Sequence, residues 1–232
     1  MGRLVALLAL AAALAGCAGG EPAADGGSAT LWVTRDRGAT VLHDEKVPAG
    51  MTVLQALDRV ADIETRYGGR FVQAVDGIEG SLERGDDWFY YVNGYLAERG
   101  AAEYRLRDGD VAWWDYRDWA GGGEREDRVV VGAFPEPFLH GYGGHVRDAV
   151  VTYAEPSQEA AARRLAEVVD GRVVRAAPSD GANVLALVAG GTRMVASLRG
   201  DEAGPVRFEV AGTAVERLAA DPAAYERRYR VP

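Results

Sequence analysis

Asn93 and Gly94 stand between two short aromatic runs, Trp88–Val92 and Tyr95–Ala97. An Asn-Gly pair favours a type I′ turn, because both central residues of that turn need a positive φ. The pair therefore predicts a β-hairpin that places many aromatic side chains on neighbouring strands. The composition fits a folded protein: 48% of the 232 residues are hydrophobic and 26% are charged. These fractions exclude a disordered chain, collagen and a multi-span membrane protein.

The residues around this hairpin predict a small mixed sheet crossed by one helix. Thr52 is a predicted N-cap, and its helix is expected to run to about Tyr67, where Gly68 and Gly69 end it. Strands are expected at Thr30–Thr34, Ala39–Val47, Phe71–Ile78, Tyr104–Leu106 and Val111–Trp119, besides the hairpin. The order ββα followed by further strands predicts an α+β fold of the β-grasp kind, with an unrelated α+β meander as the alternative.

Two segments of different character follow one another along the chain. All five tryptophans lie in residues 30–120, which carry 11 basic and 17 acidic residues. Residues 128–232 contain no tryptophan and carry 13 of each charge. Residues 121–127, a glycine run followed by charges, are a predicted linker. We therefore expect a β-grasp domain over 30–120 and a small α/β or α+β domain over 128–232.

The second segment predicts one or two helices on a sheet. Helices are expected from Pro156 to Val169 and over Thr213–Ala220. Strands are expected at Arg128–Ala133, Asp148–Tyr153, Arg172–Ala177, Asn183–Ala189, Arg193–Ser197 and Val206–Val210. Two prolines predict that residues 134–138 are extended or turning. The arginine-rich end, Tyr225–Arg230, is expected to be a surface tail.

The amino-terminal segment indicates export. Leu4–Leu14 is an apolar run that is shorter than the roughly 20 residues of a membrane-spanning helix but suits a signal peptide. The sequence Leu-Ala-Gly-Cys that ends at Cys17 resembles the lipobox of bacterial lipoproteins, in which the cysteine thiol receives a diacylglycerol before cleavage. This resemblance implies a signal peptide over 1–16, a lipid on Cys17 (palmitate among its acyl chains) and a flexible tether over 17–29. A plain secretory signal with an incidental cysteine, or a buried helix, is the alternative.

A second resemblance concerns the hairpin and the segment after it. The run from Trp88 to Gly94, the run from Ala101 to Trp114 and the helix opening Thr52–Leu57 together resemble the transcobalamin-like C-terminal domain family. The resemblance covers residues 30–117 and implies a β-grasp that binds a soluble ligand. In vitamin B12 carriers the equivalent domain covers one side of the corrinoid. This chain lacks the long α-helical barrel that forms the other half of that site, so the resemblance implies the fold more strongly than the corrinoid.

Strand alternation distributes the aromatic side chains over both faces of the predicted sheet. One helix covers only one face, so the second face must be covered by the other domain, be covered by a ligand or remain exposed. For a ligand, the predicted stacking residues are Trp88, Tyr90, Tyr91, Trp113, Trp114, Tyr116 and Trp119, with Asn93 and Gly94 shaping the rim.

No other pattern in the chain reaches the standard of a catalytic or metal site. His140 and His145 lie in a glycine-rich loop, and with Glu136 they are the only metal set that the sequence offers. No second carboxylate is spaced to orient them, so we expect no metal, no cofactor and no enzymatic activity. The formal net charge of −9 argues against nucleic acid as a partner.

The sequence therefore leaves three functional hypotheses. The first is a lipid-anchored protein on the extracytoplasmic face of the cell membrane that captures a small molecule, corrinoid-like or other, for uptake. The second is an accessory or structural envelope protein that docks on a membrane transport complex and binds no small molecule. The third is a hydrolase that uses the two loop histidines.

Overall fold

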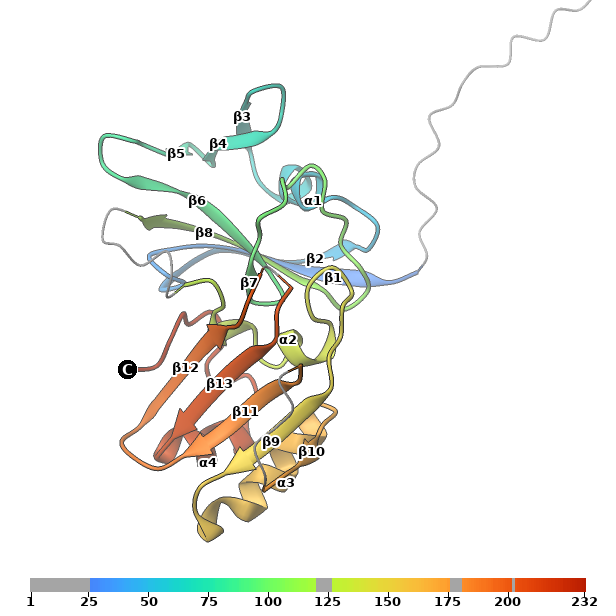
Figure 1. Ribbon diagram of the computed structural model, residues 1–232. Helices are drawn as coiled ribbons and strands as arrows, with labels where there is room; N and C mark the ends of the chain where they lie inside the picture. Colours follow the sequence, from blue (N-terminus) through green and yellow to red (C-terminus); the bar gives the residue numbers. More distant parts are fainter. Residues whose placement is uncertain (1–25, 120–126, 176–180, 202) are drawn as a thin grey trace, which may run out of the picture.

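The computed structural model describes residues 26–119, 127–175, 181–201 and 203–232. Two five-stranded sheets, one three-stranded sheet and a few short helices make up these residues, which agrees with the predicted α+β class (Figure 1). The predicted signal peptide, Cys17 and linker residues 121–126 lie outside the described residues. None of the described helices is long and apolar enough to cross a membrane.

The front sheet contains the predicted hairpin. Its strand order is β2-β1-β8-β6-β7, in which β1 and β8 are parallel and the other neighbours are antiparallel. The strands are β1 (Ser28–Arg35), β2 (Thr40–Pro48), β6 (Asp86–Val92), β7 (Tyr95–Leu96) and β8 (Val111–Asp118). Asn93 and Gly94 have φ values of 49° and 82°, as the predicted turn requires. The strand expected at Tyr104–Leu106 is reduced to an isolated bridge between Arg105 and Thr52.

The helix of the front half, α1 (Val53–Val60), begins where predicted and ends earlier. The Thr52 side chain accepts a hydrogen bond from the Gln55 N–H, and the Gln55 side chain accepts one from the Thr52 N–H, which makes a capping box. The helix ends because the next residues pair as a strand. Asp62 N–H donates to the Asp76 carboxylate at 3.0 Å, and Asp76 N–H donates to the Asp62 carbonyl at 2.8 Å.

That pairing starts a small antiparallel sheet, here called the tip sheet, at the upper end of the molecule in Figure 1. It consists of β3 (Ile63–Arg66), β4 (Phe71–Val75) and β5 (Ile78–Glu79), in that order. The residues of β3 had been expected to continue the helix, and the single strand predicted over Phe71–Ile78 is two strands joined by a turn at Asp76 and Gly77.

The back sheet has the strand order β10-β9-β11-β13-β12, with every neighbouring pair parallel except β13 and β12. Its strands are β9 (Ala149–Tyr153), β10 (Arg172–Val173), β11 (Asn183–Val188), β12 (Arg193–Leu198) and β13 (Val206–Ala211). The helix α3 (Glu159–Val168), which follows the 3-10 helix η3 (Pro156–Gln158), and α4 (Thr213–Ala220) pack on it. These elements lie close to their predicted positions.

The segment between the two sheets differs from its prediction. The strand expected at 128–133 is the 3-10 helix η2 (Val131–Ala133), and a short helix, α2 (Glu136–Leu139), follows it. The two prolines do not prevent that helix, because Pro135 is its N-cap and Pro137 lies in its first turn. A missing N–H costs nothing at these positions.

The carboxyl-terminal segment is not a surface tail. Tyr225 and Tyr229 are buried, and the Tyr229 side chain lies against the front sheet. The backbone approaches closely there, since a Cβ on Gly38 would lie 1.8 Å from the Arg227 carbonyl oxygen. The back half thus covers the face of the front sheet that α1 leaves open.

We predict that Tyr229→Ala destabilises the protein by about 3–5 kcal/mol, because it removes a buried ring and leaves a cavity between the two halves. Urea unfolding of the full chain measures this loss. The matched control is Arg228→Ala, since Arg228 is exposed in the same segment and its change should stay within about 0.5 kcal/mol of wild type. Equal stability of the two variants would contradict the packing role of Tyr229.

Candidate ligand-binding site

The predicted stacking residues divide between the two faces of the front sheet. On the α1 side, Trp88, Tyr90 and Trp114 belong to the main hydrophobic core and are at most 8% exposed. The Tyr90 and Trp114 rings stack with centroids 4.9 Å apart, and the Trp88 indole N–H donates to the Ile78 carbonyl at 2.9 Å. These three side chains therefore serve the packing of the front half.

On the opposite face, Tyr91 and Trp113 are fully buried beneath Tyr229. The Tyr229 ring lies 5.4 Å from each of their rings, in edge-to-face geometry. The surplus aromatic face is thus covered by the back half, as one of the sequence-based alternatives held. A ligand role for these rings stays a prediction, and it would require the covering residues to move.

The remaining predicted residues lie at the margins of the sheet. Tyr116 and Trp119 are half-buried, and the Tyr116 hydroxyl donates to the Glu79 carbonyl at 3.0 Å. Asn93 is fully buried. Its amide donates to the Asp110 carboxylate at 2.7 Å and to the Gly141 carbonyl at 2.8 Å. Asn93 therefore joins the hairpin to the loop after α2 and does not line an open rim.

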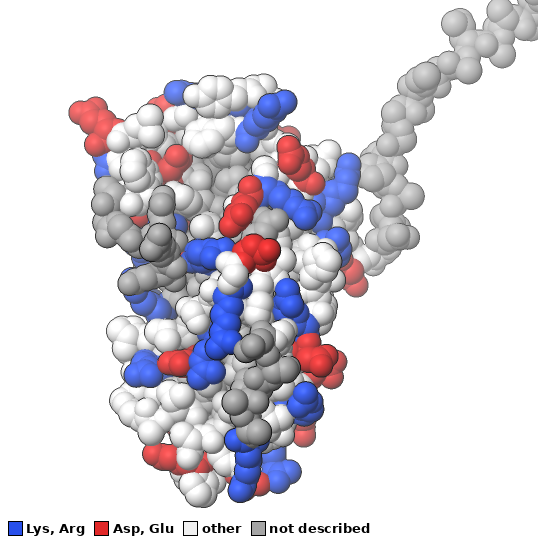
Figure 2. All heavy atoms as spheres, viewed as in Figure 1, with Lys and Arg blue, Asp and Glu red and all other residues white. Residues whose placement is uncertain are grey.

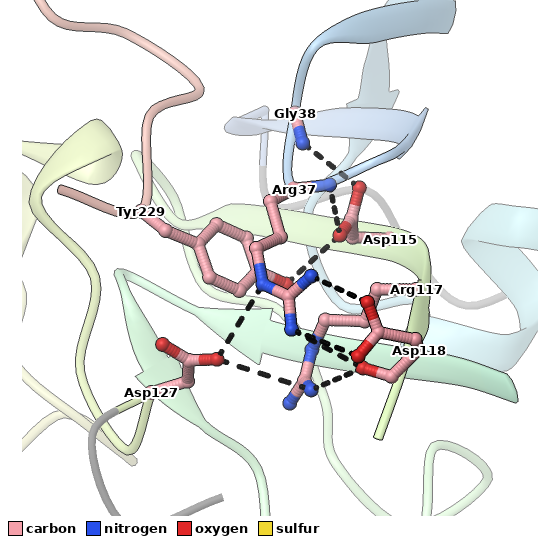
Figure 3. A network of polar contacts seen from close by, with 7 residues as sticks. All are labelled: Arg37, Gly38, Asp115, Arg117, Asp118, Asp127 and Tyr229. Atoms are coloured by element: carbon pink, nitrogen blue, oxygen red, sulfur yellow. Dashed lines mark hydrogen bonds and ion pairs between the residues drawn. The ribbon is translucent and has the colours of Figure 1, made fainter. Parts of the chain in front are cut away.

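A buried carboxylate organises the contact between the halves (Figure 3). The Asp115 side chain accepts hydrogen bonds from the Thr34 hydroxyl at 2.5 Å, the Tyr229 hydroxyl at 2.9 Å and the N–H groups of Arg37 and Gly38 at 3.1 Å each. Burial raises the pKa of Asp115 above its ordinary value, and these donors act in the opposite direction. Because donors of the protein itself already surround the Asp115 carboxylate, this carboxylate is not available to bind a ligand.

The loop histidines do not form a metal site together. The His140 ring bonds to the Glu136 carboxylate on α2, whereas His145 is exposed. Burial raises the pKa of Glu136, and its bond to His140 opposes that rise. Nowhere in 26–119, 127–175, 181–201 or 203–232 do three His, Cys, Asp or Glu side chains gather as a metal ion requires.

An open pocket of about 410 Å³ lies on the tip sheet, a volume within the usual range for small-molecule sites. We call it the tip pocket; it is lined by Arg66, Tyr67, Phe71, Gln73, Glu79, Gly80, Ser81, Leu82 and Asp87. Tyr67 is 80% exposed, Leu82 is 85% exposed and Phe71 is 38% exposed. In Figure 2 the upper end of the molecule, over β3 and β4, includes an uncharged area with charged side chains at its margins.

The polar groups of the tip pocket are held in place. The Gln73 amide donates to the Glu79 carboxylate at 3.0 Å and to the Gly80 carbonyl at 3.1 Å, and Arg66 forms an ion pair with Glu79 at 3.2 Å. Asp87 is half-buried, and burial raises its pKa. A Cβ on Gly80 would lie 2.5 Å from an Asp87 carboxylate oxygen, so the glycine leaves room for that carboxylate.

Sequence reasoning missed this pocket. It assigned Tyr67 to the end of a helix and Phe71 to a strand, which separates the two rings. In the structure they lie at the two ends of a glycine-containing turn, with centroids 6.3 Å apart in edge-to-face geometry. The signal was the sequence from Tyr67 to Phe71 itself, since aromatic residues on both sides of Gly68 and Gly69 indicate a tight hairpin.

Comparisons with known proteins give one family match and several structural matches. A family model, "Domain of unknown function (DUF4430)", matches residues 50–118. Two solved structures each match 40% of this chain at 14% identity: a candidate metal-binding protein from Ruminococcus gnavus ATCC 29149 (97% of that chain, TM-score 0.31) and haptocorrin in complex with Cbi (25% of that chain, TM-score 0.32). No match was found among the curated proteins. These TM-scores are too low to carry a ligand over to this chain.

The raised pKa of Asp87 predicts a pH dependence of stability. The folded state binds the Asp87 proton more tightly than the unfolded state, so this group stabilises the fold below its ordinary pKa of 3.8. That contribution is lost as the pH rises through the folded-state pKa. Relative to Asp87→Asn, the wild type should therefore lose unfolding free energy over this interval. Denaturant unfolding at several pH values measures the difference.

Glu83→Gln is the matched control, because it removes one negative charge from an exposed position in the loop that precedes β6. An NMR titration of the Asp87 carboxyl carbon gives the pKa directly. A midpoint at or below 3.8 would contradict the burial of this group.

Proposed function

We propose that this chain is a lipid-anchored extracytoplasmic protein that binds a small organic molecule, without catalysis, in the tip pocket. The supporting observation is the exposure of Tyr67 and Leu82 beside fixed polar groups in a pocket of about 410 Å³. Large apolar side chains gathered on a surface usually mark an interaction site. Of the predicted stacking residues, Trp88, Tyr90 and Trp114 contribute indirectly, because they share the main hydrophobic core with Val72 and Val75 of the tip sheet.

The lining of the pocket suits a ligand of two parts. The Tyr67 and Phe71 rings offer an apolar surface for a flat or aliphatic body. Asp87 also lines the pocket, and its carboxylate is an acceptor for an amide, hydroxyl or ammonium group of a ligand. A corrinoid, which the family resemblance suggests, is one flat molecule to test, and haem is another.

The anchor rests on the sequence alone. Cys17 is the only cysteine of the chain and stands at the position that a lipobox acylates. Two or three acyl chains hold a protein stably at a membrane, whereas one is marginal. The predicted tether over 17–29 overlaps β1, which begins at Ser28 and buries Ala29. A tether that ends before Ser28 would present the described part of the chain at the extracytoplasmic face, where a binding protein for uptake would work.

We further propose that the front half is a β-grasp. The central parallel pair β1 and β8, the antiparallel partners on both sides and the placement of α1 between β2 and the later strands support this assignment. The DUF4430 match covers α1, the tip sheet and β8, so the tip pocket lies inside the matched region.

The alternative function is an accessory envelope protein that docks on a membrane transport complex. The observation that favours it is Leu82, which stands 85% exposed in the loop between β5 and β6. A side chain of that kind also suits a protein contact. The ligand experiment below separates the two functions.

For the ligand function, we predict that the fluorescent apolar probe 1-anilinonaphthalene-8-sulfonate binds the full chain and that Tyr67→Ser combined with Leu82→Ser abolishes most of this binding. Both side chains are exposed, so the unfolding free energy should change by no more than about 0.5 kcal/mol. Fluorescence titration measures the binding, followed by competition with cobinamide and with haem.

The matched control is Val41→Ser, because Val41 is an exposed apolar residue of β2 outside the pocket. Equal probe binding by the double variant and by Val41→Ser would overturn the pocket assignment. Failure of every competitor, together with cross-linking of Leu82 to a membrane protein in cells, would favour the accessory function.

For the anchor, we predict that Cys17→Ala leaves the signal peptide uncleaved at this position and the protein without acyl chains. Intact-mass spectrometry of the membrane fraction measures both. Wild type should begin at Cys17 and carry two or three fatty acyl chains. A wild-type product without acyl chains would contradict lipidation while leaving the tip pocket untested, so the two parts of the proposal stand separately.

A further inference from the structure

The strand β12 has an open edge. Among the residues that the structure describes, it pairs with β13 on one side, and on the other side only Met194 is paired. Met194 N–H donates to the Val231 carbonyl at 2.9 Å, and Val231 N–H donates to the Met194 carbonyl at 2.8 Å. Alternate residues of a strand direct their backbone groups to the same side. The N–H and C=O groups of Ala196 and Leu198 therefore point outward from the sheet, beyond the Val231 bridge.

The carboxyl-terminal segment creates this opening. Immediately before Val231 it turns away from β12, and the Tyr229 carbonyl accepts its hydrogen bond from Val131 N–H at 3.2 Å. The turn delivers the Tyr229 ring to the front sheet and leaves a wedge of about 420 Å³ beside β12. This wedge, here called the edge groove, is lined by Asp127, Arg128, Val129, Val195, Ala196, Ser197, Leu198, Tyr229 and Arg230.

The other edge strands of the two large sheets have features that discourage pairing with another chain, and β12 does not. β7 and β10 are two residues long. β2 is long but carries Asp44, Glu45 and Lys46 in succession, and charged side chains discourage pairing with another chain. The exposed part of the β12 edge carries an alanine, a serine and a leucine, which place no charge and no proline against an incoming strand.

The side chains around the edge groove favour an added strand in which apolar and acidic residues alternate. Ala196 and Leu198 lie toward the hydrophobic core, so residues of an added strand on that face would be apolar. The opposite face carries Arg193 and Arg207, which share the Glu209 carboxylate at 3.4 Å and 3.0 Å. Two guanidinium groups on one carboxylate leave a net positive charge on this face, and the lining of the edge groove adds Arg128 and Arg230 against Asp127. Residues of an added strand on this face would therefore be acidic.

We propose that the edge groove binds an extended acidic peptide of a partner protein, which adds to the back sheet as a strand beside β12. The backbone groups of Ala196 and Leu198 supply the hydrogen bonds, and the alternation of apolar and acidic side chains supplies the specificity. The site is separate from the tip pocket and does not depend on it.

The probe is a six-residue peptide of alternating valine and glutamate, with both ends blocked, added to the isotope-labelled full chain up to about 1 mM. We expect NMR shift changes at the Ala196 and Leu198 amides. Ala196→Pro should weaken binding roughly tenfold or more, because it removes an outward N–H and inserts a ring at the edge. Proline is tolerated at an edge position whose N–H faces outward, so this variant should fold.

Three controls keep the result independent of folding. A peptide N-methylated on its valines loses its backbone donors, and a peptide of alternating valine and lysine reverses the charge; both should bind at least about tenfold more weakly. Glu64→Gln, an exposed change on the tip sheet, should leave binding unchanged. Absent shift changes, or equal binding of the parent and N-methylated peptides, would overturn the proposal. Concentration-dependent dimerisation that Ala196→Pro abolishes would also overturn it, in favour of a second copy of this chain.

Discussion

The front sheet is apolar on both faces, and the rest of the structure follows from the need to cover both. Trp114 and Trp113 are neighbours on β8, so their side chains point to opposite sides of the sheet, and both are buried. A short helix such as α1 covers one face. The other face would leave a large aromatic area in water, and burying it against the second half of the chain recovers roughly 25 cal/mol for each Å² of apolar surface. The two halves are therefore parts of one packed structure.

Polar groups are buried in this contact together with the rings, and only some of their atoms have hydrogen-bond partners: the Tyr91 hydroxyl and two nitrogens of Arg117 have none among the described residues. Asp115 lies in the middle of the contact, and a buried carboxylate is costly unless donors surround it. Three of its four donors belong to β1 and the turn after β1, and the fourth, the Tyr229 hydroxyl, comes from the carboxyl-terminal segment, so the network is complete only when the two halves meet. Arg117 is also buried, and its guanidinium lies 4.0 Å from the centre of the Phe89 ring. The aromatic rings thus make the contact between the two halves favourable, and the hydrogen bonds of the polar groups fix how the two halves fit together.

The sequence predicts the elements of this fold better than their ends and contacts. The hairpin at Asn93 and Gly94 and the N-cap at Thr52 could be predicted, because each depends on the local backbone. The end of α1 could not, because it depends on Asp62 pairing with Asp76, fourteen residues further along the chain. Tyr229 gave no local signal either, since its partners on the front sheet are more than a hundred residues away. The tip pocket was not predicted for the same reason, because its lining comes from several elements between β3 and β6.

Each of the two proposed binding surfaces exposes groups that the described residues leave uncovered. Tyr67 and Leu82 expose apolar side chains, and β12 exposes backbone groups that the carboxyl-terminal segment leaves unpaired when it turns toward the front sheet. Each exposure follows from how the chain packs elsewhere. Covering the second aromatic face takes Tyr229 away from β12, and extending the front half into the tip sheet takes Tyr67 and Phe71 beyond the reach of α1. A chain that retains such surfaces gains nothing in stability from them, which is why we assign them to binding.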